Sequence, residues 1–244
     1  NRSKTGGRFV IFDKSHKKEH GLFLFRDENA GIQFQLPLVG PGKEVTSDSL
    51  AFPHCQGIFD WPVNKYLPVL LPELTFDDQV VIPSYYGKNC VTGIGLRNSF
   101  YLRFEQPDLV RTDGTFAYGL GSCQVQWSFG QGKVTSEFTF RVKNQVTMNS
   151  MRYAIVIGSP HSAYRLGTTL RQGTAGLRPT VEKDDFKAAW GDFETVTDDP
   201  EYRGYAGNVH YVQFLRREHP LIMRPGVQYK FQISFEPDIA FADE

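Results

Sequence analysis

The sequence lacks a charge excess and long apolar runs. Its 27 basic and 27 acidic residues balance, whereas a nucleic-acid-binding protein usually carries a basic excess. No apolar stretch approaches the roughly 18–20 residues that a membrane-spanning helix needs. We therefore expect neither nucleic acid nor membrane among its partners.

Familiar cysteine and catalytic motifs are also missing. Cys55, Cys90 and Cys123 have no C-x-x-C spacing, and an odd count leaves at least one thiol unpaired within the chain. The cysteines are compatible with any cellular compartment, and an extracellular location is slightly favoured. Residues 16–20, HKKEH, match the letters of an inverted zincin motif, but strand-like segments on both sides indicate a hairpin loop. Residues 93–98 begin like a dinucleotide fingerprint but lack its last glycine. We therefore expect no metal and no cofactor.

Alternation of apolar and polar residues is the strongest positive signal. In residues 226–238, every second residue from Val227 to Phe235 is apolar, and the residues between them are polar or charged. The same period of two recurs in residues 136–144 and 98–107. Such alternation, rich in aromatic and β-branched residues, is typical of half-buried antiparallel strands.

Turn signals divide the chain into many such strands. The segments DENAG and FGQGK separate strand-like runs, as hairpin loops do. Residues 181–194 are the best candidate for a helix, with acidic residues near the start. The sequence thus predicts an all-β fold: an antiparallel β-sandwich or jelly roll of about ten to twelve strands with one short helix. We expect residues 1–244 to form a single domain.

Two long irregular stretches, residues 40–95 and 158–208, are predicted to be functional or covering loops. The first contains LAFPHCQGIFDWP, in which His54 lies close to Trp61. His54 is a candidate base and Trp61 a candidate wall for stacking against a sugar. A packed or hydrogen-bonded loop histidine is the alternative interpretation.

The outward faces of the predicted strands carry long polar side chains. Four of these are candidates for binding a glycan, because guanidinium and amino groups bind carboxylates and amides bind hydroxyls: Arg103, Gln126, Arg141 and Lys143. Trp127 is a further candidate for stacking on a sugar ring. A plain solvated sheet face is the alternative, since any alternating strand shows polar residues on one side.

The long antiparallel strands, the LAFPHCQGIFDWP loop and the terminal RPGVQYKFQISF strand resemble the β-sandwich domain of heparinase-type polysaccharide lyases. In that family the sandwich follows a helical toroid, and the catalytic cleft lies between the two. The toroid is missing from this sequence. The resemblance implies a polysaccharide substrate, and it makes His54 the first choice for a histidine contributed by the sandwich.

The functional hypothesis is a carbohydrate-active sandwich that acts on or binds a polysaccharide, with β-elimination at a uronate as the candidate reaction. His54 and Tyr211 are the candidates for proton transfer, and Arg103 and Arg141 for neutralising the carboxylate. Trp61, Trp127, Gln126 and Lys143 are the candidate substrate-binding residues. The alternatives are a non-catalytic carbohydrate-binding module and a structural module that forms homo-oligomers, so whether the chain is an enzyme stays open.

Overall fold

The computed structural model describes residues 5–11, 20–27, 32–39, 71–77, 79–83, 88–94, 99–111, 115–159, 163–172, 175–196, 208–216 and 219–238. Within these ranges every regular element is a strand, so the predicted all-β class is confirmed. The strands are β1 (Thr5–Ile11), β2 (His20–Asp27), β3 (Ile32–Val39), β4 (Pro72–Phe76), β5 (Gln79–Ile82), β6 (Lys88–Ile94), β7 (Phe100–Gln106), β8 (Val110–Arg111), β9 (Gly121–Gly130), β10 (Lys133–Val142), β11 (Val146–Ser159), β12 (Ala163–Leu166), β13 (Thr169–Gln172), β14 (Ala175–Asp184), β15 (Ala189–Val196), β16 (Asn208–Arg216), β17 (Leu221–Met223) and β18 (Tyr229–Pro237).

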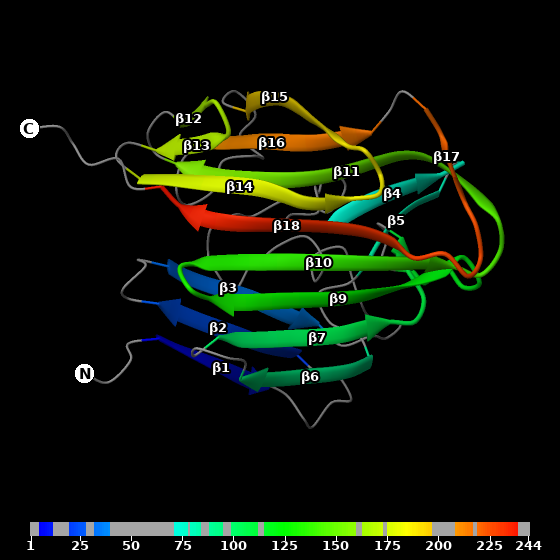
Figure 1. The fold of residues 1–244 in the computed structure, drawn as a ribbon, viewed down its shortest axis with the longest axis horizontal. Helices are drawn as coiled ribbons and strands as arrows, with labels where there is room; N and C mark the ends of the chain where they lie inside the picture. Colours follow the sequence, from blue (N-terminus) through cyan, green and yellow to red (C-terminus); the bar gives the residue numbers. More distant parts are fainter. Residues whose placement is uncertain are drawn as a thin grey trace, which may run out of the picture.

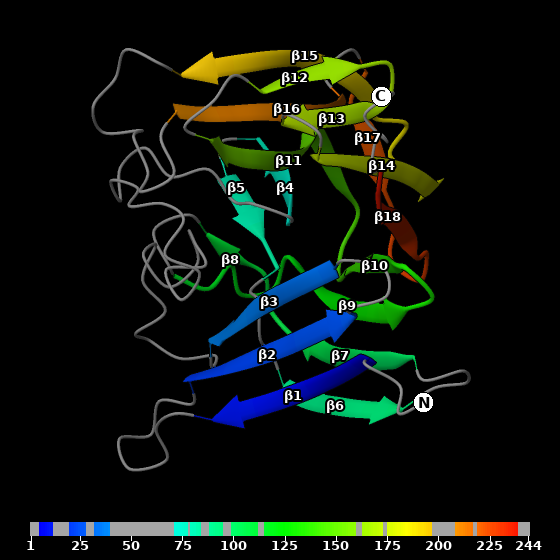
Figure 2. The same cartoon turned by 90° about the vertical axis from the view of Figure 1, so that its left-hand side faces the viewer.

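These strands form a β-sandwich, as predicted, from three antiparallel sheets. The eight-stranded sheet has the order β12-β13-β14-β18-β10-β9-β7-β6. The seven-stranded sheet has the order β15-β16-β11-β4-β5-β8, with β17 paired to β11, and the three-stranded sheet has the order β1-β2-β3. Figures 1 and 2 show the two smaller sheets on the same side of the eight-stranded sheet. The described strands exceed the expected ten to twelve, because β4–β6 and β12–β15 lie within residues 40–95 and 158–208, which the sequence predicts to be loops.

The helix predicted over residues 181–194 is wrong. β14 runs through Asp184 and β15 begins at Ala189, with a tight turn between them. The carboxylate of Asp184 accepts hydrogen bonds from the backbone N–H groups of Phe186 (2.8 Å) and Ala188 (2.6 Å). Phe186 is fully buried and packs edge-on against Phe140 at 5.7 Å between ring centroids. The acidic residues therefore close a turn.

Aromatic side chains from both layers fill the core. Tyr153 of β11 lies between the two large sheets, with its ring 5.0 Å from Phe231 of β18 and 6.2 Å from Phe138 of β10. All three side chains have no exposed surface. In the alternation predicted for residues 226–238, the inward position of Val227 is wrong, because Val227 precedes β18 and is 44% exposed. The inward positions from Tyr229 to Phe235, and those within 138–142, are confirmed, because their apolar members are all buried. The polar residues between them consequently lie on the outer face of the eight-stranded sheet.

The hairpins follow the predicted turns. β9 and β10 are joined at Gln131 (φ 55°) and Gly132 (φ 75°), and two successive positive φ angles are the requirement of the tight turns that suit twisted hairpins. β2 pairs with β3 on either side of the DENAG segment. β1 pairs with β2 on either side of residues 12–19, as expected for a hairpin at HKKEH, and His20 is the first residue of β2. The rest of that motif lies outside the described residues.

Candidate functional site

The predicted site residues are distributed over several places. His54 and Trp61 lie outside the described residues. Tyr211 belongs to β16 of the seven-stranded sheet. Arg103, Gln126 and Arg141 belong to β7, β9 and β10 of the eight-stranded sheet.

The structure does not bring Tyr211 together with the two arginines. Arg103 and Arg141 follow the polar alternation of β7 and β10, so they lie on the outer face of the eight-stranded sheet. The seven-stranded sheet, which contains Tyr211, packs against the inner face, and packed sheets lie about 10 Å apart. A single site that uses Tyr211 as base and either arginine as carboxylate partner is therefore not formed.

Two further candidates have other structural roles. Trp127 is 0% exposed and lies in the core between Phe129 and Phe138. A side chain without exposed surface cannot stack on a sugar, so the assignment of Trp127 to glycan binding is corrected. Lys143, just beyond β10, forms an ion pair with Asp108 at 2.9 Å.

Arg103 and Gln126 are brought together, and they belong to a row of polar residues across the eight-stranded sheet. In the strand register Arg103 pairs with Gln126, Gln126 with Glu137, and Glu137 with Gln232. The rows on either side read Tyr101, Ser128, Thr135 and Ser234, and Glu105, Gln124, Thr139 and Lys230. Directly opposed residues have Cβ atoms roughly 5 Å apart, so these rows form one continuous polar surface.

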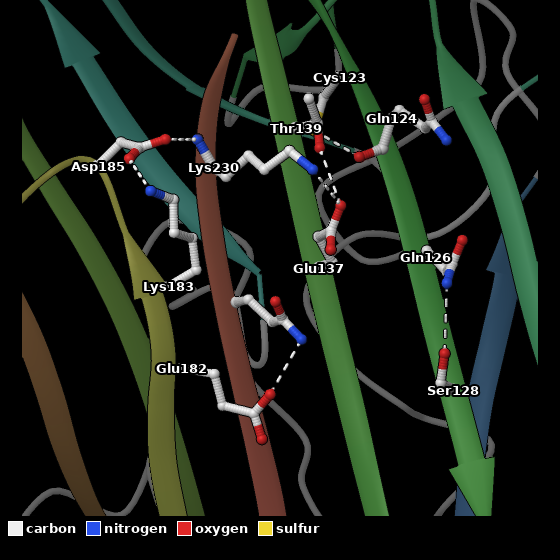
Figure 3. A network of polar contacts seen from close by, with 11 residues as sticks. Cys123, Gln124, Gln126, Ser128, Glu137, Thr139, Glu182, Lys183, Asp185 and Lys230 are labelled. Atoms are coloured by element: carbon white, nitrogen blue, oxygen red, sulfur yellow. Dashed lines mark hydrogen bonds and ion pairs between the residues drawn. The ribbon is translucent and has the colours of Figure 1, made fainter.

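One half of this surface, on β10, β18 and β14, is internally paired. Nζ of Lys230 lies 3.1 Å from Oε1 of Glu137, which also accepts a hydrogen bond from the Thr139 hydroxyl. Glu182 forms an ion pair with Lys133 at 2.8 Å and accepts a hydrogen bond from the Gln232 amide at 3.0 Å. Figure 3 shows Glu137, Thr139 and Lys230 close together, with Glu182 on the same outer face. The hydrogen bond from Lys133 holds the pKa of Glu182 below its usual value.

The other half, which we call the β7–β9 surface, consists of Tyr101, Arg103, Gln124, Gln126 and Arg141. Four groups on this surface have no hydrogen-bond or ion-pair partner within the described part of the chain. They are the guanidinium groups of Arg103 and Arg141, the Tyr101 hydroxyl and the Gln124 amide. Gln126 donates one weak hydrogen bond, 3.4 Å long, to Ser128. This surface therefore offers two cations, two amides and a phenol to a ligand.

Tyr101 has a defined position because of a glycine. Tyr101 pairs with Gly93 of β6, and a Cβ atom at Gly93 would lie 2.5 Å from both Cζ and Oη of Tyr101. The tyrosine ring thus lies across the backbone of the neighbouring strand, in space that only glycine leaves open. The period of two in residues 98–107 is consistent with an outward Tyr101, but the contact with Gly93 depends on the pairing of β6 with β7.

The inner face below Arg141 carries a cysteine with no catalytic character. Cys123 is buried, and its thiol donates a weak hydrogen bond to the backbone oxygen of Gln124 at 3.5 Å. Burial raises the pKa of this thiol, although the charge of Arg141 acts in the opposite direction. The thiol is therefore neutral at ordinary pH and is a core residue.

Among residues with a described position, no group of three or more histidine, cysteine, aspartate or glutamate side chains could hold a metal ion. The same residues include no helix long and apolar enough to cross a bilayer.

Comparisons with known proteins identify related folds. No family model matches the chain, and no curated protein sequence matches it. The structure of galactose 1-epimerase from Lactobacillus acidophilus NCFM is similar, with a TM-score of 0.50 and 7% identity, over 98% of this chain and 100% of that chain. This similarity shows a shared sandwich fold.

Two polysaccharide lyases are also among the structural neighbours. The heparan sulfate lyase HepC from Pedobacter heparinus has a TM-score of 0.48 and 9% identity, and the match covers 92% of this chain. This chain spans 34% of the length of that lyase. A second polysaccharide lyase has a TM-score of 0.40 and 11% identity over 98% of this chain and 33% of its own. The neighbours named here are thus an epimerase of galactose and two lyases of polysaccharides.

Proposed function

We propose that this chain binds an acidic polysaccharide on the β7–β9 surface. The observation that carries the proposal is the pair of arginines, Arg103 and Arg141, that have no carboxylate partner within the described residues. They lie beside the amides of Gln124 and Gln126 on the same outer face. The neighbouring half of the face has its charges paired internally, which leaves the β7–β9 surface as the half available to a charged ligand.

The residue types suit a polyuronate. A guanidinium group binds a carboxylate through two parallel hydrogen bonds, and a glutamine amide offers both donors and an acceptor to sugar hydroxyls. The Tyr101 ring, held across Gly93, adds apolar area with little loss of side-chain entropy. The acidic Glu105 also lies on the outer face of β7, and its register partner on β6 is Lys88.

Binding to immobilised or soluble polysaccharides tests the proposal. We expect a polyuronate to be retained, a neutral glucan to be retained less, and added salt to weaken the polyuronate complex. An exposed ion pair contributes up to about 1 kcal/mol, so Arg103→Gln or Arg141→Gln should each weaken binding by up to about fivefold. The double variant should lose more than either single variant.

Arg178→Gln is the matched control. Arg178 lies on β14 of the same eight-stranded sheet, but its guanidinium group forms an ion pair with Asp238 at 3.2 Å. The same change of charge at Arg178 should leave polyuronate binding within twofold of the unmodified protein, a change of about 0.4 kcal/mol. Equal losses from all three substitutions would mean that net charge alone attracts the polysaccharide, and the assigned surface would be wrong.

β-Elimination at a uronate is the second candidate function, and the arrangement of Tyr101 and Arg103 favours it. These residues are two apart on β7, so their side chains lie on one face. In the reaction, an arginine neutralises the uronate carboxylate and a base removes the adjacent carbon-bound proton. The electron pair forms a carbon–carbon double bond, the bond to the leaving oxygen breaks, and that oxygen takes up a proton.

The product decides between binding and elimination. An unsaturated uronate absorbs ultraviolet light, so the absorbance of a polyuronate solution should rise with time if the chain is a lyase. Tyr101→Phe should abolish this rise without reducing binding more than about threefold. If only His54→Ala abolishes it, the base is His54, as the sequence predicts. No rise with any of several acidic polysaccharides would leave binding as the function.

A further inference from the structure

A hollow at the end of the sandwich lies between the β4–β5 hairpin and the start of β11. It has a volume of about 310 Å³ and no residue in common with the β7–β9 surface. Four exposed polar residues line it: Asp77, Gln79, Gln145 and Thr147. These supply a carboxylate, two amides and a hydroxyl, all within one concave site.

The hollow also has an apolar part. Phe76, Leu120 and Val146 complete its lining. Phe76 is 5% exposed and belongs to the core, whereas the other two are partly buried and pack against that core. An apolar wall beside convergent hydrogen-bonding groups is the usual composition of a small-molecule site. The apolar C–H face of a sugar ring would contact this wall while its hydroxyls meet the polar residues.

Gln79 is oriented by a neighbouring arginine. Nη2 of Arg111 donates to Oε1 of Gln79 at 3.2 Å, and Nη1 of Arg111 donates to the backbone oxygen of Phe116 at 2.6 Å. Because the amide oxygen of Gln79 is engaged, its NH₂ group remains as a hydrogen-bond donor in a residue that lines the hollow. Arg111 is thus a positioning residue. The Gln79 NH₂ group is thus a hydrogen-bond donor and the Asp77 carboxylate an acceptor. Two neighbouring sugar hydroxyls require one group of each kind.

We propose that this hollow binds a neutral pyranose through its vicinal hydroxyls. The carboxylate of Asp77 repels an anionic ligand at close range, so the site should discriminate against uronates. That preference is opposite to the one proposed for the β7–β9 surface. The ligand is either a free hexose or a sugar unit of a neutral glycan, since the hydroxyl chemistry is the same in both.

The inference is tested by titrating the whole chain with D-glucose, D-galactose, D-mannose and D-glucuronate. Saturation-transfer NMR and calorimetry measure the binding of each sugar. At least one neutral hexose should bind. Thr147→Val and Gln145→Ala should each weaken that hexose by about threefold to tenfold, the effect of one neutral hydrogen bond. Gln228→Ala, an exposed glutamine outside the hollow, is the control and should change nothing.

A charge variant tests the discrimination. Asp77 has a φ of 50°, a conformation that asparagine tolerates as well as aspartate does. Asp77→Asn therefore removes the charge without new backbone strain. Glucuronate should bind the unmodified chain more weakly than glucose, and this difference should shrink in Asp77→Asn.

Further arms separate the ligand sources and the two proposals. A neutral oligosaccharide that binds more tightly than the free hexose indicates a glycan chain, whereas equal affinity indicates a single sugar. Arg103→Gln should leave hexose binding unchanged, and Thr147→Val should leave polyuronate binding unchanged, so either proposal can fail alone. The inference is overturned if no neutral hexose binds, if Thr147→Val and Gln145→Ala bind as the unmodified chain does, or if glucuronate binds as well as glucose.

Discussion

Replacement of Trp127 by alanine should cost stability before it affects any binding. The indole is 0% exposed, with Phe129 stacked at 6.4 Å and Phe138 edge-on at 6.3 Å between ring centroids. A buried aromatic side chain removes about 150–250 Å² from water, which at about 25 cal/mol per Å² corresponds to about 4–6 kcal/mol. Measured losses for replacing such a side chain by alanine are about 3–5 kcal/mol, and they depend on how far the surrounding side chains close the cavity.

Urea unfolding followed by circular dichroism measures this loss. We expect Trp127→Ala to lower the free energy of unfolding by about 3–5 kcal/mol, a large part of the roughly 5–15 kcal/mol that a typical domain has. Trp127→Phe should lose less, because it retains an aromatic ring in the core. Tyr118→Ala is the control, since Tyr118 is 74% exposed and its replacement should change stability by less than about 0.5 kcal/mol.

The opposite result would refute the reasoning. If Trp127→Ala unfolds within about 1 kcal/mol of the unmodified protein but no longer retains a polysaccharide, the indole would be a surface stacking residue. The folded fraction of Trp127→Ala should instead bind a polyuronate with unchanged affinity, because the β7–β9 surface lies on the opposite face of β9.

Two further predictions concern the outer face. Gly93→Ala should weaken polyuronate binding with little change in melting temperature, because the added Cβ would lie 2.5 Å from the Tyr101 hydroxyl oxygen and displace only the end of that side chain. Unchanged polyuronate binding in Gly93→Ala would exclude Tyr101 from the binding surface. Gly176→Ala is not a matched control, because its added Cβ would meet a backbone oxygen at 2.3 Å. The Lys133 hydrogen bond lowers the pKa of Glu182 from 4.5, so its stabilisation is complete above that pH and is lost as the pH falls through the lowered pKa. Between about pH 5 and pH 3, Glu182→Gln should therefore lose less stability than the unmodified chain. Urea unfolding at several pH values measures this difference. Parallel profiles of unfolding free energy against pH would contradict the hydrogen bond from Lys133 as the cause of the lowered pKa.

Much of the sandwich could be predicted from local patterns. The alternation in residues 226–238 correctly identified the buried and outward positions from Tyr229 onward, because successive side chains of a strand point to opposite faces. It failed at Val227, which precedes the strand and is 44% exposed. FGQGK was recognised as a hairpin turn because glycine readily adopts positive φ angles. The helix over residues 181–194 failed for a physical reason as well. Its acidic residues resemble a helix start, but the hydrogen bonds of Asp184 and the burial of Phe186 close a turn between two strands.

The candidate site could be predicted only in part. Arg103 and Gln126 were chosen as outward polar residues, and the structure places them opposite each other. The sequence could not show that Trp127, one residue further along β9, has no exposed surface. It also could not show that Lys143 has an acidic partner, since Asp108 is far from it along the chain.

The sequence by itself determined the all-β class, the inward and outward faces of its strands and the balance of charge, because these follow from the composition and a period of two. Only the tertiary structure decided which strands are neighbours. It placed β18 between β14 and β10, put Tyr211 and Arg103 in different sheets, and paired the charges on one half of the outer face. Those outcomes depend on contacts between residues distant in the chain, and no local pattern specifies them.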